Sequence, residues 1–105
     1  MAFTCSIPAV PTVQRDDDDI RITRWDFLPG AVTGWHTHGW PYFVVMLTDA
    51  VMHFHDGKDV TERRLAQGES YGRPSGIVHD VKNGGTAPMA FVEIEIKRPS
   101  AIAFP

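Results

Sequence analysis

The sequence predicts a single all-β domain, arranged as a sandwich or a closed barrel of short strands. Eight prolines and nine glycines are spread through its 105 residues, so a long amphipathic helix has no place to form. Runs rich in β-branched and aromatic residues alternate at close spacing with turn sequences, a pattern typical of all-β folds. The length fits one domain with one modest core, and 43% hydrophobic with 22% charged residues is ordinary for a folded chain.

The expected strands follow one another with a turn or a break after each. They are, in chain order, IRITRWDFL (20–28), YFVVML (42–47), AVMHFH (50–55), IVHDVK (77–82) and MAFVEIEIK (89–97). The turn signals are FLPGAVTG (27–34), DGK (56–58) and NGGTAP (83–88), and the charged segment 59–76 joins the two halves. Closing such strands into a barrel hides their edges.

We expect an N-terminal arm over residues 1–19, a barrel over residues 20–98 and a C-terminal tail over residues 99–105. The run Asp16–Asp19 in the arm has the carboxylates that hard cations prefer. It lacks, however, the alternating ligands and the glycine of a calcium loop. We therefore interpret it as a solvated entry to the first strand.

Charge and cysteine content exclude several classes of partner. A net charge of −3 and a pI near 5.9 offer no basic surface to nucleic acid, and no stretch approaches the roughly 18 apolar residues of a membrane span. Cys5 is the single cysteine, so it forms no intrachain disulfide, and neither a helix start nor a basic neighbour marks it as reactive. The first residues lack the features of a secretory signal, so we expect a cytoplasmic protein.

The segment GWHTHGWPY (34–42) concentrates the residues with chemical potential. In an extended chain, residues two apart share a face, although Gly39 and Pro41 put that condition at risk here. The residues that would share one face are His36, His38, Trp40, Tyr42, Val44 and Met46. An isolated pair of histidines is more often part of a half-buried strand, so a functional role for His36 and His38 needs support from elsewhere in the sequence.

Two segments carry fixed spacings. The first, GAVTGWHTHGWPY, gives Gly30, five residues, His36, one, His38, three, Tyr42. The second, GESYGRPSGIVHDVKN, gives Gly68, five residues, Pro74, one, Gly76, two, His79, three, Asn83. This pair resembles the two motifs of the cupin family, G-x5-H-x-H-x3,4-E-x6-G and G-x5-P-x-G-x2-H-x3-N.

The second match is complete, and the first departs at two positions. Tyr42 stands where the family usually has a glutamate ligand, and Asp49 stands where its closing glycine would be. Aspartate tolerates a left-handed turn conformation, so the second departure threatens the fold little. TRWDFLPGAVTGWHTHGWPY (23–42) is also similar to small single-domain cupins in which tyrosine replaces the glutamate. These include cupins encoded with β-alanine degradation enzymes, and the wider group includes metal-dependent lyases.

The resemblance implies a jelly-roll barrel, or double-stranded β-helix, in which His36, His38 and His79 bind one divalent metal ion. Neutral imidazole is a common donor for Fe²⁺, Zn²⁺, Ni²⁺ and Cu²⁺. Fe²⁺ is favoured by analogy with three-histidine cupin dioxygenases, with Zn²⁺, Ni²⁺, Mn²⁺ or Cu²⁺ as alternatives. Three protein ligands leave open positions, which is typical of a reactive site.

Without the glutamate, the ion keeps its full double charge, which favours an anionic ligand. Tyr42 is then expected to donate a hydrogen bond to a bound substrate; acid or base catalysis and direct phenolate coordination follow as alternatives. A tyrosine hydrogen-bonded to the backbone is the structural alternative.

The substrate pocket is expected to include residues from three parts of the chain. The candidates are Trp40, Val44, Met46, Arg73 and Glu93. Arg73, or alternatively Arg24, is suited to hold a substrate carboxylate by a two-pronged contact. Glu93 and Glu95 share the face opposite the aliphatic residues of their strand, and parity leaves open whether that face is inward.

Other aromatic and imidazole residues have weaker assignments. Trp35 and Phe43 either line the mouth of the site or pack, and Trp35 is expected to pack between sheets. His53 and His55 match neither motif, and we expect them to face solvent or a neighbouring strand.

Three functions fit these patterns. The first is a metal-dependent enzyme acting on a small, carboxylate-bearing metabolite, either as a dioxygenase or as a Lewis-acid lyase or isomerase. The second is a non-catalytic cupin that binds a metal or small molecule, and the third is a structural barrel. A homodimer is expected, formed through IRITRW (20–25) as an edge strand or through the tail AIAFP (101–105).

Overall fold

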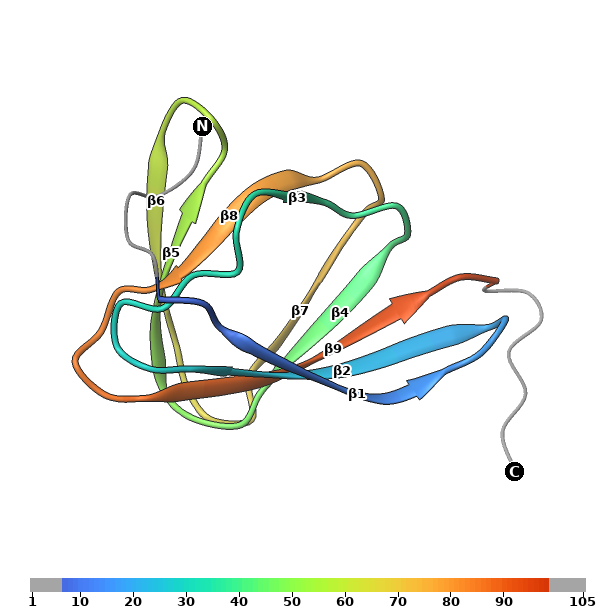
Figure 1. Cartoon of the computed structure of the whole chain (residues 1–105), viewed down its shortest axis with the longest axis horizontal. Coiled ribbons are helices and arrows are strands. Elements are labelled where there is room, and N and C mark those ends of the chain that lie inside the picture. Colours follow the sequence, from blue (N-terminus) through green and yellow to red (C-terminus); the bar gives the residue numbers. More distant parts are fainter. Residues whose placement is uncertain (1–6, 99–105) are drawn as a thin grey trace.

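The computed structural model describes residues 7–98, and these form two antiparallel sheets (Figure 1). Their strands are β1 (Val10–Asp16), β2 (Ile20–Phe27), β3 (His36–Thr37), β4 (Tyr42–Met46), β5 (Ala50–His55), β6 (Val60–Leu65), β7 (Ser70–Arg73), β8 (Val78–Asn83) and β9 (Met89–Ile96). One sheet has the order β1-β2-β9-β4-β7 and the other has the order β3-β8-β5-β6. The all-β double-stranded β-helix predicted from the sequence is confirmed. A search of the described residues finds no helix with the length and hydropathy of a membrane span.

The segment 10–16, which lies within the predicted arm, forms a strand that pairs with β2. β2 therefore has β1 on one side and β9 on the other. The expectation that IRITRW serves as an edge strand is wrong, because an additional strand covers that edge. Cys5 and the segment 101–105 lie outside the described residues.

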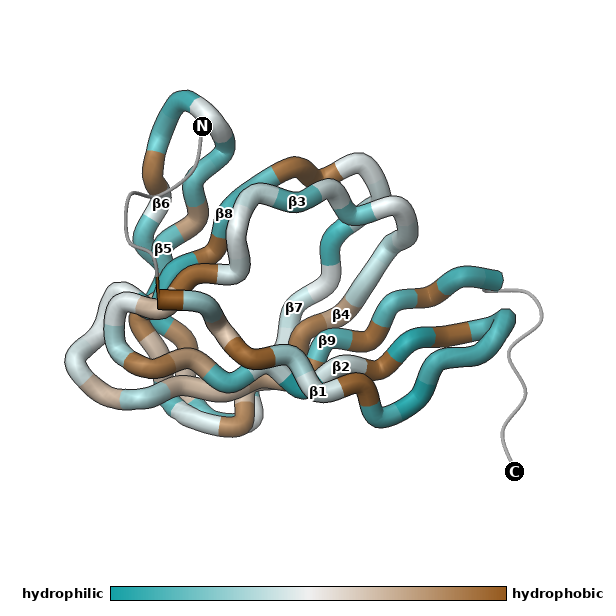
Figure 2. Tube along the Cα trace, viewed as in Figure 1, coloured by the Kyte–Doolittle hydropathy of each residue, from teal (hydrophilic) through white to brown (hydrophobic). Residues whose placement is uncertain are grey.

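In the acidic run, Asp16 ends β1 and residues 17–19 form the turn to β2, which stands out as hydrophilic in Figure 2. The Asp17 carboxylate accepts hydrogen bonds from the backbone N–H groups of Asp19 (2.8 Å) and Ile20 (2.9 Å). The bond from Ile20 is the main cause that lowers the pKa of Asp17 to about 2. Asp19 pairs with Arg98 at 2.7 Å. The run is thus a solvated turn at the start of β2, in agreement with the sequence interpretation.

The inward face of the five-stranded sheet changes from apolar at one end to polar at the other. Residues directly opposite each other in antiparallel strands share a face, so the register defines rows across the sheet. From the apolar end, these rows are Phe27–Met89, Trp25–Phe91–Met46, Thr23–Glu93–Val44–Tyr71 and Arg21–Glu95–Tyr42–Arg73. The apolar rows belong to the core, and the polar rows face the histidines described below.

Both glutamates of β9 therefore point inward, and its aliphatic residues point outward. Glu95 is buried, and the Glu93 side chain is 12% exposed. The sequence left this orientation open, because alternation by itself does not say which of two faces is inside. Two buried carboxylates mark this end of the barrel as polar.

Candidate metal centre

Two separate segments bring three histidines together. His36 in β3 and His79 in β8 are direct cross-strand partners, so both side chains lie on one face. His38 follows β3, and its backbone N–H donates to the carbonyl of Ile77 (2.8 Å). The N–H of Gly76 donates in return to the carbonyl of His38 (2.8 Å). Gly76 has a φ of 91°, which favours glycine at this motif position.

The three imidazoles converge through the same ring nitrogen. His36 Nε2 lies 2.9 Å from His38 Nε2, which lies 3.0 Å from His79 Nε2. Each pair of rings is close to perpendicular, with centroids 4.7–5.0 Å apart. His38 and His79 are buried, whereas His36 is half-buried. The convergence predicted for these residues is therefore present in the structure.

Hydrogen bonding and burial leave these nitrogens able to act as electron-pair donors. His36 Nδ1 lies 2.8 Å from the carbonyl oxygen of Gly34, which only accepts, so Nδ1 carries a proton, and in the neutral ring the lone pair of Nε2 then faces the other two histidines. Burial, reinforced by neighbouring imidazoles, lowers the pKa of His38 to about 4 and that of His79 to about 3. Both rings are accordingly neutral near neutral pH.

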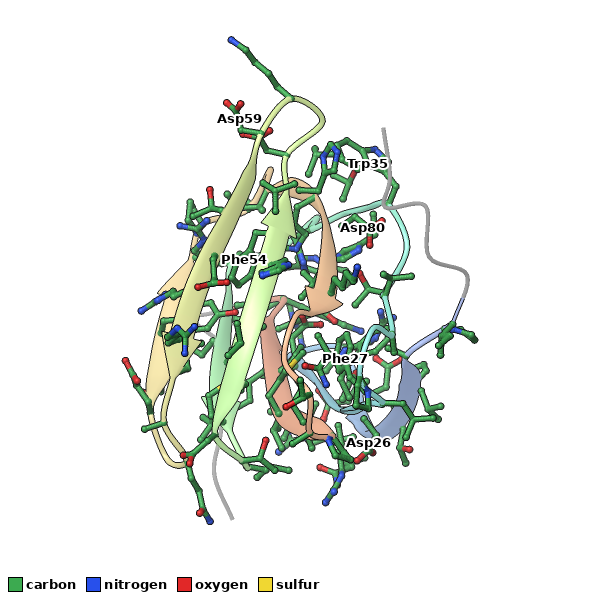
Figure 3. The ribbon with its side chains drawn as sticks, turned by 90° about the vertical axis from the view of Figure 1, so that its left-hand side faces the viewer. Asp26, Phe27, Trp35, Phe54, Asp59 and Asp80 are labelled. Atoms are coloured by element: carbon green, nitrogen blue, oxygen red, sulfur yellow. The ribbon has the colours of Figure 1, made fainter. Side chains whose placement is uncertain are left out.

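Asp80 supports this arrangement from behind. Its carboxylate accepts a hydrogen bond from the N–H of Gly34 (3.1 Å), the residue whose carbonyl orients His36. Figure 3 shows Asp80 and Trp35, which follow His79 and precede His36 in the chain, toward the end of the molecule that carries Asp59. Phe27, in the apolar row, lies toward the other end.

The donor set fits a divalent transition-metal ion. Imidazole nitrogens that face one another at about 3 Å share either a proton or a cation between their lone pairs, and one cation can serve all three. Nitrogen ligands about 2.1 Å from one ion are about 3.0 Å apart at right angles, but about 3.4 Å apart at the tetrahedral angle. The separations of 2.9 and 3.0 Å match the right-angle case.

Tyr42 stacks on one of the three imidazoles. Its ring and that of His38 have centroids 3.9 Å apart and planes inclined by 21°. Burial, followed by the charge of Glu93, raises the pKa of Tyr42 to about 12, although a hydrogen bond with Arg73 acts in the opposite direction. In the absence of a bound ion, Tyr42 is therefore a neutral phenol near neutral pH, as its expected role of hydrogen-bond donor requires.

Carboxylates approach the histidines from β9 rather than from the usual motif position. Glu93 Oε2 lies 4.0 Å from His38 Nε2, and Glu95 also has a carboxylate oxygen within 4.8 Å of a His38 ring nitrogen. Burial and the charge of Glu95 raise the pKa of Glu93 to about 7, against a hydrogen bond from Trp25. Burial also raises the pKa of Glu95. The position occupied by Tyr42 thus lacks a carboxylate, but the site has two nearby.

Two cavities adjoin the histidines. A small interior one is lined by Tyr42, Val44 and Glu93 together with His36 and His79. A larger one, of about 430 Å³, is lined by Arg73 and His79 among others. Four of the candidate residues for substrate chemistry, namely Tyr42, Val44, Arg73 and Glu93, therefore line a cavity that includes a histidine of the cluster.

A model of the cupin domain family matches residues 23–95. The chain belongs to the cupin family. The β-alanine degradation protein BauB of Pseudomonas aeruginosa PAO1 is 43% identical over 89 residues, which cover 85% of this cupin and 94% of that protein.

Solved structures agree with the assignment. A cupin domain from Bordetella pertussis Tohama I is 38% identical, with a TM-score of 0.85, and the match covers 91% of this cupin and all of that chain. A protein with a double-stranded β-helix domain from Klebsiella pneumoniae is 20% identical, with a TM-score of 0.71 and a match covering 91% and 83% of the two chains. This second likeness shows the fold alone.

The remaining candidates lie apart from both cavities of this cupin. Met46 belongs to the buried core. Trp40 precedes β4 at the Gly39–Pro41 break and packs beside two cations, with Arg21 Cζ 5.4 Å and Lys97 Nζ 5.0 Å from its ring centroid. Trp40 therefore lies beside Arg21 of the inward polar row, but it lines neither cavity.

The outer surface holds the other residues considered from the sequence. Trp35 and Phe43 are exposed, so the expectation that Trp35 packs between sheets is wrong. Trp35 precedes β3, where the chain is not yet paired with β8. Arg24 pairs with Asp26 at 3.1 Å, and both side chains are nearly half exposed.

His53 and His55 have separate partners. His53 Nε2 lies 3.1 Å from Glu62 Oε1, its cross-strand neighbour in β6. His55 Nδ1 accepts a hydrogen bond from the N–H of Gly57 (2.8 Å), and its ring meets Trp35 edge-on with centroids 6.3 Å apart. The expectation that this pair faces solvent or a neighbouring strand is confirmed for His53.

Sequence reasoning missed several residues around the site of this cupin. Trp25 and Tyr71 line the interior cavity, Tyr71 also lines the larger one, and Asp80 supports His36. Trp25 has a sequence signal, because it alternates with Thr23 and Phe27 in β2. Asp80 follows the motif histidine directly and lies on the opposite face of β8. Its hydrogen bond to Gly34, a residue distant in the sequence, leaves no local pattern that would have marked it.

Asp49 stands at the position of the closing motif glycine and requires no left-handed conformation. Non-glycine residues with positive φ are absent from the described part of the chain. The carboxylate of Asp49 accepts a hydrogen bond from the N–H of Gln67 (2.8 Å). The substitution is therefore compatible with the turn, for a reason other than conformational tolerance.

Proposed function

We propose that this cupin is a metal-dependent enzyme that holds one divalent ion on His36, His38 and His79 and acts on a small, carboxylate-bearing metabolite. The observation that carries the proposal is the convergence of the Nε2 atoms of three histidines inside the barrel, next to a cavity. Buried polar groups without a partner are unfavourable, and one shared cation would satisfy all three nitrogens at once.

The ion supplies Lewis-acid chemistry when bound, or with Fe²⁺ the ability to use dioxygen. Fe²⁺ is the favoured choice, by analogy with three-histidine cupin dioxygenases, with Zn²⁺, Ni²⁺, Mn²⁺ and Cu²⁺ as alternatives.

Tyr42 is the proposed catalytic residue. The stacking on His38 and the hydrogen bond with Arg73 hold its phenol, whose raised pKa keeps the O–H available as a donor. Its role is to donate a hydrogen bond to an oxygen of the substrate. Glu93, with its pKa near 7, is able to hold or release a proton close to Tyr42 at physiological pH.

The proposed substrate class rests on the charge of the metal ion and on the similarity to BauB. An ion with three neutral ligands keeps its double charge and attracts a carboxylate. The relative at 43% identity is named for β-alanine degradation, which supports a role in the metabolism of β-alanine or of a related three-carbon acid. The chemistry is then dioxygenase-like with Fe²⁺, or of the lyase or isomerase type with the other ions.

Elemental analysis of untagged protein, purified without added metal, tests the first half of the proposal. The expected result is about one transition-metal ion per chain. NMR then follows β-alanine and related three-carbon acids with the loaded protein, in air and under argon. Consumption only in air indicates oxygen chemistry, and consumption in both indicates Lewis-acid chemistry. A bound ion without consumption of any of these acids would favour the non-catalytic binding function.

A homodimer remains part of the proposal, with β1 as the edge available for it. Val10 and Val13 on this strand are 58% and 57% exposed. Mass measurement in solution at micromolar concentration is expected to give twice the chain mass, and a monomer would remove this element without affecting the metal centre.

A further inference from the structure

Two arginines differ from all the others in the chain. The sequence has seven arginines, and five of them form ion pairs with aspartate or glutamate. Within residues 7–98, no ion pair with a carboxylate is found for the remaining two, Arg63 and Arg73. Their positive charges are therefore available to an anion from outside the chain.

Both arginines lie on the inward faces of their sheets. Arg63 in β6 is opposite Met52, which is fully buried, and Arg73 in β7 is opposite Tyr42, which is nearly so. Because direct partners in antiparallel strands share a face, the two arginines point toward the space between the sheets. Arg64, the next residue in β6, points the other way and pairs with Glu62 at 3.5 Å.

The strands that carry these arginines are the two edges on one side of the molecule. β6 ends the four-stranded sheet and β7 ends the five-stranded sheet. The cavity of about 430 Å³ is lined by both arginines, and its volume lies within the range of small-ligand pockets, about 300–1,000 Å³. Arg73 has a hydrogen bond with the neutral phenol of Tyr42, but neither guanidinium group has an ion pair with a carboxylate within residues 7–98, so an opening that carries both is suited to an anionic ligand.

The walls of this cavity connect the arginines to the histidine cluster. Tyr71 and His79 line both this cavity and the small interior one. The Arg63 guanidinium carbon lies 4.7 Å from the ring centroid of Tyr71, a cation–π contact that restrains it. Phe54, labelled in Figure 3, contributes an apolar wall whose ring centroid is 6.0 Å from that of His79.

The acidic residue in the lining is already engaged. Asp56 accepts hydrogen bonds from the backbone N–H groups of Lys58 (2.9 Å) and Asp59 (2.7 Å), which hold its carboxylate at the β5–β6 turn. It therefore does not satisfy either guanidinium group by an ion pair.

We propose that the cavity between β6 and β7 is the substrate-binding site, and that Arg63 and Arg73 together bind the carboxylate of a short-chain acid. The apolar wall at Phe54 then holds the hydrocarbon part, and the other end of the molecule faces His79. This inference rests on the proposed function for the identity of the reacting end, but the arginine pair binds the carboxylate with or without a metal. Arg63, which no sequence motif marks, becomes the residue that selects acids over their neutral analogues.

Propionate is the probe for this site. Its dissociation constant is measured by NMR chemical-shift titration at low ionic strength, on the metal-loaded protein and on the protein stripped with a chelator. Wild type is compared with Arg63→Gln, Arg73→Gln and the matched control Arg64→Gln, which removes an outward arginine from the same strand. Propionamide serves as the neutral analogue, and metal content and melting temperature are recorded for every variant.

The Kd for propionate is expected to rise about ten-fold in Arg63→Gln and in Arg73→Gln, which corresponds to the loss of a charge-assisted hydrogen bond, and to stay unchanged in Arg64→Gln. Arg63→Lys is expected to fall between, because it keeps the charge without the planar fork. Metal content is expected to be unchanged in Arg63→Gln, and propionamide is expected not to compete.

Three results would overturn the inference: no propionate binding to wild type, an equal Kd in Arg63→Gln and wild type, or an equal loss in Arg64→Gln. Binding only to the loaded protein, with the same Kd in every variant, would overturn it too while leaving the metal proposal intact. Arginine-dependent binding to a protein that takes up no transition metal when one is added would instead support this site and refute the metal centre of the proposed function.

Discussion

Residues His36 and His38 have the same spacing as His53 and His55, yet the two pairs occupy opposite environments. The first pair points into the barrel and meets His79 from a segment more than forty residues away, with Nε2 separations of 2.9 and 3.0 Å. In the second pair, His53 binds a glutamate across the strand and His55 caps its own hairpin. The difference teaches that the third ring and the direction of the face, rather than the spacing, distinguish the metal-site candidate.

The largest effect should come from removing imidazoles of one pair and then of the other. His36→Ala and His79→Ala are each expected to lose nearly all bound metal, because only two of the three donors remain. His53→Ala and His55→Ala are expected to retain it. Elemental analysis of the four variants, purified in parallel, measures the bound metal. Loss of metal in His53→Ala would contradict the assignment of the metal to the inward histidines alone.

Tyr42→Phe tests the residue that stacks on the inward pair. The substitution keeps the ring against His38 and removes only the hydroxyl, so metal content should stay at the wild-type level. Turnover is expected to fall about 100-fold, the scale of losing one hydrogen-bond donor to a reacting oxygen. Loss of the ion to the same extent as in His79→Ala would show that the phenol acts as a ligand.

Asp80→Ala tests the support behind the inward pair. It removes the acceptor for the Gly34 N–H and so loosens the carbonyl that orients His36. Metal affinity, measured by competition with a chromogenic chelator, is expected to fall about ten-fold, as for other groups that orient metal ligands. Glu62→Gln, which acts on the outward pair, is the matched control and should leave affinity unchanged.

Gly84→Ala probes the packing of the outward pair. A Cβ at this position would lie 2.5 Å from His53 Nε2, so the ring has to turn away. Since the ring is only half-buried, the expected loss is about 1 kcal/mol of unfolding free energy, with full metal content. Chemical denaturation measures it. In the His53→Ala background, Gly84→Ala should have little effect on the unfolding free energy. An equally large loss there would show that the contact with the His53 ring is not its cause.

The smallest effect concerns pH. The hydrogen bond from His53 lowers the pKa of Glu62, so this carboxylate stabilises the fold above its ordinary pKa and loses the contribution as pH falls through the lowered value. Wild type is expected to melt slightly above Glu62→Gln at neutral pH, and the difference should vanish in acid. A difference in melting temperature that grows on acidification would contradict a stabilising contribution from the Glu62 carboxylate.

The sequence predicted β2, β4, β5, β8, β9 and the histidine cluster, because all of these depend on local signals. It did not predict β1 in the expected arm, or β6 and β7 in the charged segment 59–76. Alternation marks β8 and β9, a run of β-branched and aromatic residues marks β4, and the fixed spacings depend on glycines such as Gly30 and Gly76, which have φ values of 83° and 91°. The register that joins His36 to His79 then follows from the family pattern.

What escaped prediction depends on the other sheet. Whether Glu93 points inward is decided by a polar end of the barrel that other strands build. Arg63 faces a cavity only because β6 and β7 end their sheets on the same side. Trp40 packs beside Arg21 and Lys97 and lines neither cavity. These are long-range facts, which a pattern within one strand does not encode.

The strand that carries the first histidine of the cluster is only two residues long. Few backbone hydrogen bonds join β3 to β8, so the local stability of this part of the barrel is expected to be low. An ion bound by His36 and His38 on one segment and by His79 on the other would close a long loop of the chain and add stability by mass action. Binding of the ion would then complete the reactive centre and stabilise the pairing of β3 with β8 in one step. Storage in a chelating buffer would accordingly lower the stability of this part of the barrel as well as the activity.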